Sequence, residues 1–256
     1  MNKSLFNKDF KIVESIFEFH FQPVMDIHRL VSDFESNLQP IFENKATETM
    51  VPQNTPPNIP RFVLSSKKNR VLEVGPVSAI YKSTPENLIS HEAITFYQEK
   101  TRKIFRYLDG KQDVIRLKSF NTTNRIHYQL IDKNYPIEND IFGKFLKIAK
   151  PEDLKGISLT IVRKFEGYNF TNVIDAYEKR DFKFQVKIGG VPQIKQYAIS
   201  SFPIIERGLV NRIILKQDVS DESSAPEKVS ERFEEILSMT IDKITKHADE
   251  FIFKEN

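Results

Sequence analysis

The stretch that most constrains the fold of this chain is Lys11–Pro23, with the sequence KIVESIFEFHFQP. Alternate positions place four apolar side chains on one face: Val13, Phe17, Phe19 and Phe21. The other face receives the polar side chains Glu14, Glu18, His20 and Gln22. Such alternation is typical of a β-strand with one buried face. The pattern therefore predicts a strand around which the fold is organised, with its phenylalanine face in the core.

Composition narrows the classes of protein to which the chain can belong. The 256 residues are 39% hydrophobic, enough for one large or two small globular domains. The absence of Cys excludes disulfides and thiolate catalysis, and a net charge of +3 does not by itself indicate a nucleic-acid partner. No run approaches ~18 apolar residues, which predicts that no segment spans a membrane. The amino terminus lacks the apolar region of a secretory signal, so we expect a cytoplasmic protein.

Residues 1–112 are predicted to form a first lobe. The opening strand is followed by a helix over Asp26–Gln39, where the apolar residues recur at helical spacing. Strands are predicted over Arg61–Ser65 and Arg70–Tyr81, with Pro76 marking an edge or a bulge in the second. A second helix is predicted from Thr84 to about Leu108.

Residues 113–256 are predicted to form a second lobe that ends in a long helix. The predicted strands are Val114–Phe120, Arg125–Ile131, Ile157–Phe165, Asp181–Ile188, Gln193–Pro203 and Leu209–Val219. The predicted helices are a short one over Glu138–Ala149 and a long one from Pro226 to about Phe251. A turn is predicted near Glu206–Gly208.

These elements predict an α+β protein with a mostly antiparallel sheet and long amphipathic helices on one face. Each half has strands followed by one long helix, which suggests two similar lobes of strand-helix-strand-strand-helix type. The two lobes can also form one compact unit.

The polar face of the opening strand is the first candidate site. Glu14, Glu18 and His20 project from the same side of the strand at two-residue and four-residue intervals. Carboxylates beside an imidazole can perform acid–base chemistry or bind a hard cation. The alternative is a strand face that simply contacts solvent. No two His residues have the spacing of a metal-binding pair on one element, so no metal site is predicted.

A second candidate site is basic and centres on the second helix. Its members are Lys100, Arg102, Lys103, Arg106, Lys111, Arg116 and Lys118. Arg102 and Arg106 are four residues apart on a helix, so a positive stripe is expected, and Tyr97 and Tyr107 can stack on bases beside it. A phosphate-rich partner can dock on such a stripe. The alternative is the solvated face of an amphipathic helix.

The carboxyl-terminal segment carries the opposite charge. Its acidic residues are Asp221, Glu222, Glu227, Glu231, Glu234, Glu235, Asp249 and Glu250. The basic middle and the acidic end can face each other within one fold or between two copies, so a homodimer is possible.

Motifs of familiar enzymes are missing. The sequence contains no GxxxxGK, GxGxxG or GxSxG motif, and Gly189-Gly190 is not followed by a helix pattern. No cofactor is therefore predicted, and a familiar enzymatic activity is disfavoured.

Three segments give the chain its resemblance to a family. They are KIVESIFEFHFQP, RFVLSSKKNRVLEVGPVSAIYK, and a final strand pair followed by a carboxyl-terminal helix. Together they resemble a sporadically distributed, functionally uncharacterised family of bacterial and archaeal proteins of about this length. The resemblance implies no catalytic residue or cofactor. The patchy distribution of the family suggests a role in defence or mobile-element gene sets.

Three functions follow from these observations. The first is a non-enzymatic binding or interaction protein of unknown specificity, with a protein partner or a second copy, acting as an accessory factor in such a gene set. The second is a nucleic-acid-binding module that uses the basic surface around Lys100–Lys118. The third is an enzyme with a carboxylate–histidine site on the opening strand.

Overall fold

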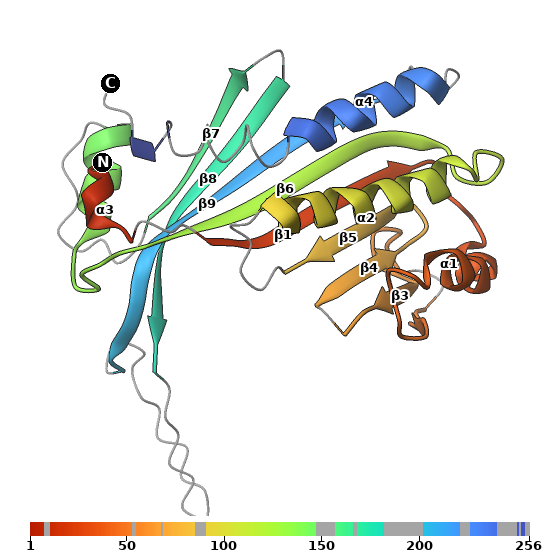
Figure 1. Ribbon diagram of the computed structural model, residues 1–256, viewed down its shortest axis with the longest axis horizontal. Helices are drawn as coiled ribbons and strands as arrows, with labels where there is room; N and C mark the ends of the chain where they lie inside the picture. The colour runs from red at the N-terminus through yellow and green to blue at the C-terminus, as the bar shows by residue number, and fades with distance from the viewer. Residues whose placement is uncertain are drawn as a thin grey trace, which may run out of the picture.

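The structure, a computed structural model, describes residues 1–7, 11–52, 55–67, 69–84, 91–146, 157–165, 168–181, 202–220, 226–239, 250 and 252–253. Within these ranges, nine strands form one antiparallel sheet of order β2-β3-β4-β5-β1-β6-β9-β8-β7 (Figure 1). The strands are β1 (Lys11–Phe21), β2 (Thr47–Glu48), β3 (Phe62–Ser65), β4 (Arg70–Val74), β5 (Ser78–Ser83), β6 (Leu117–Gln129), β7 (Ser158–Phe165), β8 (Tyr168–Arg180) and β9 (Ile204–Asp218).

Four α-helices accompany the sheet in the described part of the chain. They are α1 (Val31–Leu38), α2 (His91–Asp109), α3 (Ile137–Ile141) and α4 (Pro226–Met239). Three shorter helical turns are the 3₁₀ segments η1 (Lys3–Leu5) and η2 (Ile27–Leu30) and the π-helical segment η3 (Phe142–Leu146). The predicted α+β class and antiparallel sheet are confirmed. None of the helices in the described ranges is long and apolar enough to cross a membrane.

The opening strand β1 is the central strand of the sheet. It pairs with β5 on one side and with β6 on the other. Phe17, Phe19 and Phe21 are 0%, 0% and 2% exposed, whereas Glu18 and His20 are half-buried. The predicted buried face of the opening strand is therefore confirmed at these three phenylalanines.

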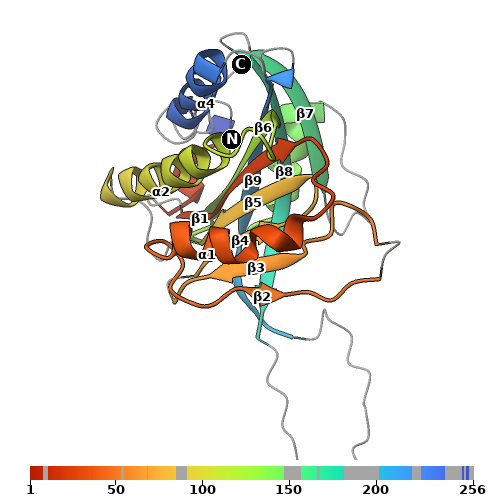
Figure 2. The same cartoon turned by 90° about the vertical axis from the view of Figure 1, so that its right-hand side faces the viewer.

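Aromatic contacts place α1 and α4 on the side of the sheet to which these phenylalanines point. Phe34 of α1 packs on Phe62 of β3 with ring centroids 5.2 Å apart, and Phe233 of α4 packs on Phe17 at 5.5 Å. Phe233 also stacks on Phe105 of α2 at 3.9 Å, so α2 joins the same core. Figure 2 shows α2 and α4 on one side of the sheet. We call the opposite side, on which Glu18 and His20 lie, the open face.

The sheet crosses the predicted boundary between the lobes at residue 112. β1 precedes that boundary and β6 follows it, yet the two strands pair from Lys11 to Phe21. The ranges 1–112 and 113–256 thus share one sheet, and the predicted division into two similar lobes stays a prediction.

The predicted helix over Asp26–Gln39 begins later than expected. The chain first forms the 3₁₀ turn η2, and α1 starts only at Val31. The side chain of Asp26 forms no capping hydrogen bond and instead pairs with Arg29, with Oδ2 and Nε 2.5 Å apart. The side chain of Asp26 therefore does not cap this helical segment.

Two strand predictions were wrong in extent. The single strand predicted over Arg70–Tyr81 is the hairpin β4–β5, in which Pro76 lies in the connection and the Gly75 amide donates to the Ser78 carbonyl at 2.8 Å. The two strands predicted on either side of Asn121–Asn124 are one strand, β6, because these residues pair with both β1 and β9.

The region between β7 and β9 also differs from its prediction. Strand β8 was not predicted, and Glu206–Gly208, predicted as a turn, lies inside β9 and pairs with β8. The predicted strands over Asp181–Ile188 and Gln193–Pro203 lie almost wholly outside the described residues, as does most of the predicted final helix beyond Met239.

Candidate functional site on the open face

Side chains from β1, β6 and β9 meet in rows across the open face. His20 pairs with Ser119 and, one strand further, Ser119 pairs with Asp218. Paired residues of adjacent antiparallel strands lie on the same side of a sheet, with strands about 4.8 Å apart. These three side chains therefore form one row on the open face.

A second row lies beside the first. Glu18 pairs with Asn121, and Asn121 pairs with Lys216. Each of these residues is two positions along its strand from a member of the first row, so the rows are about 7 Å apart. The two rows thus gather six polar side chains from strands far apart in the sequence: Glu18, His20, Ser119, Asn121, Lys216 and Asp218.

A β-bulge adds one more side chain to this group. His20 pairs with Ser119 but the next residue, Phe21, pairs with Leu117, so Lys118 is an extra residue in β6. In a regular strand Lys118 and Ser119 would point to opposite faces; a bulge redirects a side chain and often lies beside a functional site. Both residues line the same pocket here.

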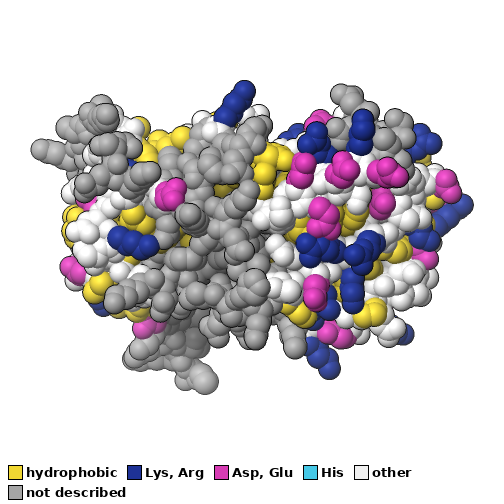
Figure 3. Space-filling model, turned by 45° about the horizontal axis from the view of Figure 1, so that its top comes forward, with side chains coloured by type: hydrophobic (Ala, Val, Ile, Leu, Met, Phe, Trp, Pro, Cys, Tyr) yellow, Lys and Arg dark blue, Asp and Glu magenta, His cyan; other side chains and the backbone are white. Residues whose placement is uncertain are grey.

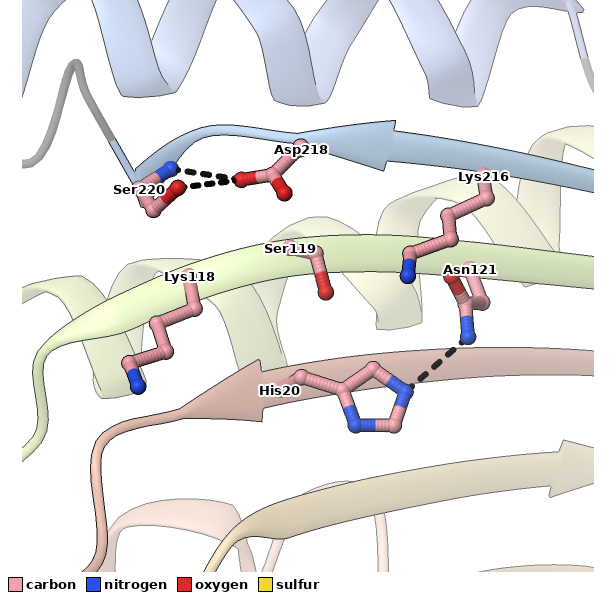
Figure 4. Close-up of a pocket in the computed structure, with 7 residues that line it drawn as sticks. All are labelled: His20, Lys118, Ser119, Asn121, Lys216, Asp218 and Ser220. Carbon is pink, nitrogen blue, oxygen red and sulfur yellow. Dashed lines mark hydrogen bonds between the residues drawn. The ribbon is translucent and has the colours of Figure 1, made fainter. Parts of the chain in front are cut away.

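The pocket formed by these residues has a volume of about 420 Å³ (Figure 4). Its lining residues are His20, Lys118, Ser119, Asn121, Lys216, Asp218 and Ser220. In Figure 4 their side chains lie in front of the strands, with helices behind the sheet. The pocket is therefore polar and faces solvent on the open side of the sheet.

His20 lies in a three-residue hydrogen-bonded cluster. Its Nε2 is 2.9 Å from Glu18 Oε2 and 3.0 Å from Asn121 Nδ2, and Asn121 Nδ2 also donates to Glu18 Oε2 at 3.3 Å. Nε2 cannot donate to the carboxylate and accept from the amide at the same time. Two arrangements of one proton therefore compete within the cluster.

The orientation of the Asn121 amide is fixed by the same cluster. Its Oδ1 is buried and has no hydrogen-bond partner among the described residues. Exchanging the amide oxygen and nitrogen would turn Oδ1 toward the Glu18 carboxylate and bury the amide hydrogens without an acceptor. The amide nitrogen therefore stays on the side of Glu18 and His20.

Hydrogen bonds keep Glu18 in its charged form. The hydrogen bond from His20 lowers the pKa of the Glu18 carboxyl most, and the one from Asn121 lowers it further, against the opposing effect of burial. Charge on His20 and Lys82 acts in the same direction. Glu18 is therefore an ionised acceptor that orients the imidazole.

Asp218 is also held in its charged form. The Ser220 hydroxyl donates to Asp218 Oδ1 at 2.6 Å and the Ser220 amide donates to the same oxygen at 2.9 Å. These bonds lower the pKa of Asp218, and the nearby charges of Lys216 and Lys118 lower it further. Figure 4 shows both bonds ending on one oxygen, which leaves Oδ2 without a donor among the described residues.

The two lysines supply the positive charge of the pocket. Lys118 and Lys216 are both exposed, and neither forms an ion pair within 4 Å with any residue in the described ranges. Both lie close enough to Asp218 to lower its pKa. The lining of the pocket therefore carries two ammonium groups and one carboxylate, and the Oδ1 atom of that carboxylate already accepts two hydrogen bonds.

Of the three residues predicted as a site on the opening strand, the structure brings two together. Glu18 and His20 are in hydrogen-bond contact, whereas Glu14 lies two residues beyond Ile16 and its Cα faces that of Arg125. Glu14 does not line the pocket. The predicted site thus narrows to Glu18 and His20.

The predicted basic surface is divided between two places. Lys118 lines the pocket on the open face, whereas Lys100, Arg102, Lys103 and Arg106 lie on α2. Figure 3 shows acidic and basic side chains side by side over the helical side of the molecule. The seven basic residues therefore do not form one surface.

Acidic partners neutralise part of the predicted basic surface. Arg102 Nε donates to both carboxylate oxygens of Glu234 on α4, at 2.9 and 3.0 Å. Lys111 Nζ lies 2.8 Å from Asp33 Oδ2. The prediction that the acidic end of the chain faces the basic middle is confirmed at Arg102–Glu234. Arg116 is exposed just before β6.

The tyrosines predicted to stack on bases are not available. Tyr97 is 1% exposed, and Tyr107 donates from its hydroxyl to Asp33 at 2.8 Å while packing on Phe34 at 4.7 Å. The exposed aromatic ring on this helix is that of Phe96, with Lys100 Nζ 4.7 Å from its centroid. The Phe96 ring thus already has a cation–π partner in Lys100.

Sequence reasoning did not identify five of the pocket residues. These are Ser119, Asn121, Lys216, Asp218 and Ser220. The signal that could have found Ser119 and Asn121 is their alternation with Phe120 in a strand next to the opening one. Which strand lies next to which is decided by long-range pairing, which the sequence pattern does not specify.

No group of three or more residues able to hold a metal ion occurs among the described residues. Comparisons of the chain with protein-family models, with curated proteins and with solved structures find no match.

Proposed function

We propose that the protein is a non-enzymatic binding protein that takes a small oxyanion of the phosphate class in the open-face pocket. The observation that carries this proposal is that Lys118 and Lys216 line the same pocket as Ser119 and Asn121. Neither lysine has an ion-pair partner in the described part of the chain. A lysine ammonium group is a common point-charge ligand for phosphate, and hydroxyl and amide groups add directed donors.

The carboxylate among the lining residues, Asp218, is compatible with an anionic ligand, and the ionised Glu18 beside the pocket is engaged by His20 and Asn121. Asp218 carries one negative charge against the two lysines, and its Oδ1 already accepts two hydrogen bonds from Ser220. Its Oδ2 can accept a hydrogen bond from a hydroxyl group of the ligand. This arrangement favours a ligand that has charged oxygen atoms and also a hydroxyl group that donates a hydrogen bond.

Catalysis at the carboxylate–histidine site is less well supported than binding. The Glu18–His20 contact is what a general base would need, but Ser119 forms no hydrogen bond with His20 among the described residues. The pocket therefore has an oriented imidazole without an activated nucleophile beside it.

Binding of nucleic acid at α2 and self-association stay separate predictions. The Arg102–Glu234 pair and the burial of Tyr97 weaken the case for α2 as a nucleic-acid surface. Nothing in the pocket requires a second copy of the chain.

Titration calorimetry with inorganic phosphate tests the proposal. We expect saturable one-to-one binding to the wild-type protein that weakens as salt concentration rises. The variant with Lys118→Gln and Lys216→Gln should bind at least tenfold more weakly, because two charge-assisted contacts are lost.

Lys103→Gln provides the matched control for this experiment. Lys103 is exposed, lies on α2 and forms no ion pair with the described residues, so the variant makes the same type of charge change on the helical side. It should keep the phosphate affinity within about twofold. Equal affinity of the wild-type and double-variant proteins, or no saturable binding at all, would refute the proposal.

A further inference from the structure

A third row of side chains borders the pocket on the open face. Ile16 pairs with Thr123, and Thr123 pairs with Ile214. These residues are two positions along their strands from Glu18, Asn121 and Lys216, so the row begins about 7 Å from the charged groups. Ile16, Thr123 and Ile214 thus form a mainly apolar strip next to the row of Glu18, Asn121 and Lys216.

The members of this strip are half-buried and β-branched. Ile16, Thr123 and Ile214 each retain part of their exposure, in contrast to the fully buried residues on the other side of the same strands. Cross-strand β-branched side chains on one sheet face make a regular surface against which aromatic rings pack well. Helices α2 and α4, which pack on the central strands β1 and β6, lie on the other side of the sheet (Figure 2).

We infer that the ligand is a phosphate monoester whose body is a planar, apolar ring. This inference rests on the proposed function, because the phosphate is held by Lys118 and Lys216 while the ring lies on Ile16, Thr123 and Ile214. A bound inorganic phosphate would leave this strip in contact with water. A ring placed there removes apolar surface from water on both partners. Ligand sites commonly combine an apolar lining with a few polar groups that fix orientation.

Two esters of equal charge test this inference by calorimetry. Phenyl phosphate carries an apolar ring, whereas methyl phosphate carries only a methyl group on the same anionic group, and neither body has a hydroxyl group. We expect the wild-type protein to bind phenyl phosphate about tenfold more tightly than methyl phosphate. The variant with Ile16→Ser and Ile214→Ser should lose that preference and keep its affinity for methyl phosphate within about twofold.

Two further variants serve as controls, one for misfolding of the double variant and one for the position of the change. Ile214→Thr keeps the β-branched shape and should reduce the preference to about threefold, which keeps the test valid if the double variant does not fold. Val63→Ser makes the same type of change on the open face of β3, which is separated from β1 by β4 and β5. It should leave both affinities unchanged.

The outcomes separate the two proposals. Equal binding of both esters by the wild-type protein overturns the inference about the ring and leaves the phosphate site intact. A preference for phenyl phosphate that survives in the double serine variant also overturns it. Failure of every phosphate compound to bind refutes the phosphate site itself.

Discussion

At the scale of single residues, neighbouring positions of β1 point to opposite faces of the sheet, one to the core and the other to the open face. Phe19 is fully buried, with its ring 4.8 Å from that of Phe17 and 6.3 Å from that of Phe233. Glu18 and His20, on either side of it, point to the open face and bond to each other. The period of two in the sequence predicted this division, because neighbouring strand residues face opposite ways.

Phe19→Asp should unfold the protein. The substitution places a charge without a partner among aromatic rings and removes their packing, and we expect a loss of about 4 kcal/mol or more in the free energy of unfolding. Urea denaturation followed by circular dichroism measures it. Val162→Asp is the control, because Val162 is 67% exposed on β7, and should cost less than about 1 kcal/mol. A folded Phe19→Asp variant as stable as the control would show that the buried face is assigned wrongly.

At the scale of elements, local pattern divided one strand, β6, and missed another, β8, and both carry polar residues on the buried face. In β6 the buried face includes Thr122 and Asn124, and in β8 it includes Asn172 between Phe170 and Ile174. These polar residues interrupt the apolar alternation on which strand prediction depends. Tertiary hydrogen bonds compensate for their burial, as when the Ser15 hydroxyl donates to Asn124 at 3.0 Å and the Asn172 amide donates to Asn211 at 3.2 Å.

Glycine explains the error at Glu206–Gly208. Gly208 was read as a turn residue, but its role in β9 is to allow close approach of the backbone of β6. A Cβ atom at this position would lie 2.1 Å from the Tyr128 carbonyl oxygen and 2.9 Å from the Tyr177 ring. A glycine inside a strand often marks such a close approach.

Gly208→Ala should therefore destabilise the protein by about 3 kcal/mol or more, because a backbone atom must move. Gly143→Ala is the matched control, since a Cβ at Gly143 meets no atom within 4 Å and should change stability by less than about 1 kcal/mol. Thermal denaturation of both variants compares them. Equal melting temperatures would contradict the close packing of β9 on β6.

At the scale of the whole molecule, stability and binding are assigned to opposite faces of one sheet. Helices α1, α2 and α4 contribute to the aromatic core on one side, and the side chains of the pocket gather on the other (Figures 2 and 4). The sequence pattern predicted the α+β class and two of the residues that line the pocket, His20 and Lys118. The strand order, and with it Ser119, Asn121 and Lys216, depends on the pairing of β1 with β6 and of β6 with β9, each between residues about 100 positions apart, which local periodicity does not encode. The family resemblance and the two similar lobes stay predictions.

Nuclear magnetic resonance during a phosphate titration tests the central claim most directly, because it locates binding over the whole molecule. The account predicts that the side-chain amide of Asn121, the ring of His20 and the backbone amides of Ser119 and Ser220 shift along one saturating curve. Resonances of α2 around Lys103 should stay in place. Shifts confined to α2, or shifts on the open face that never saturate, would contradict the assignment of the pocket as the binding site.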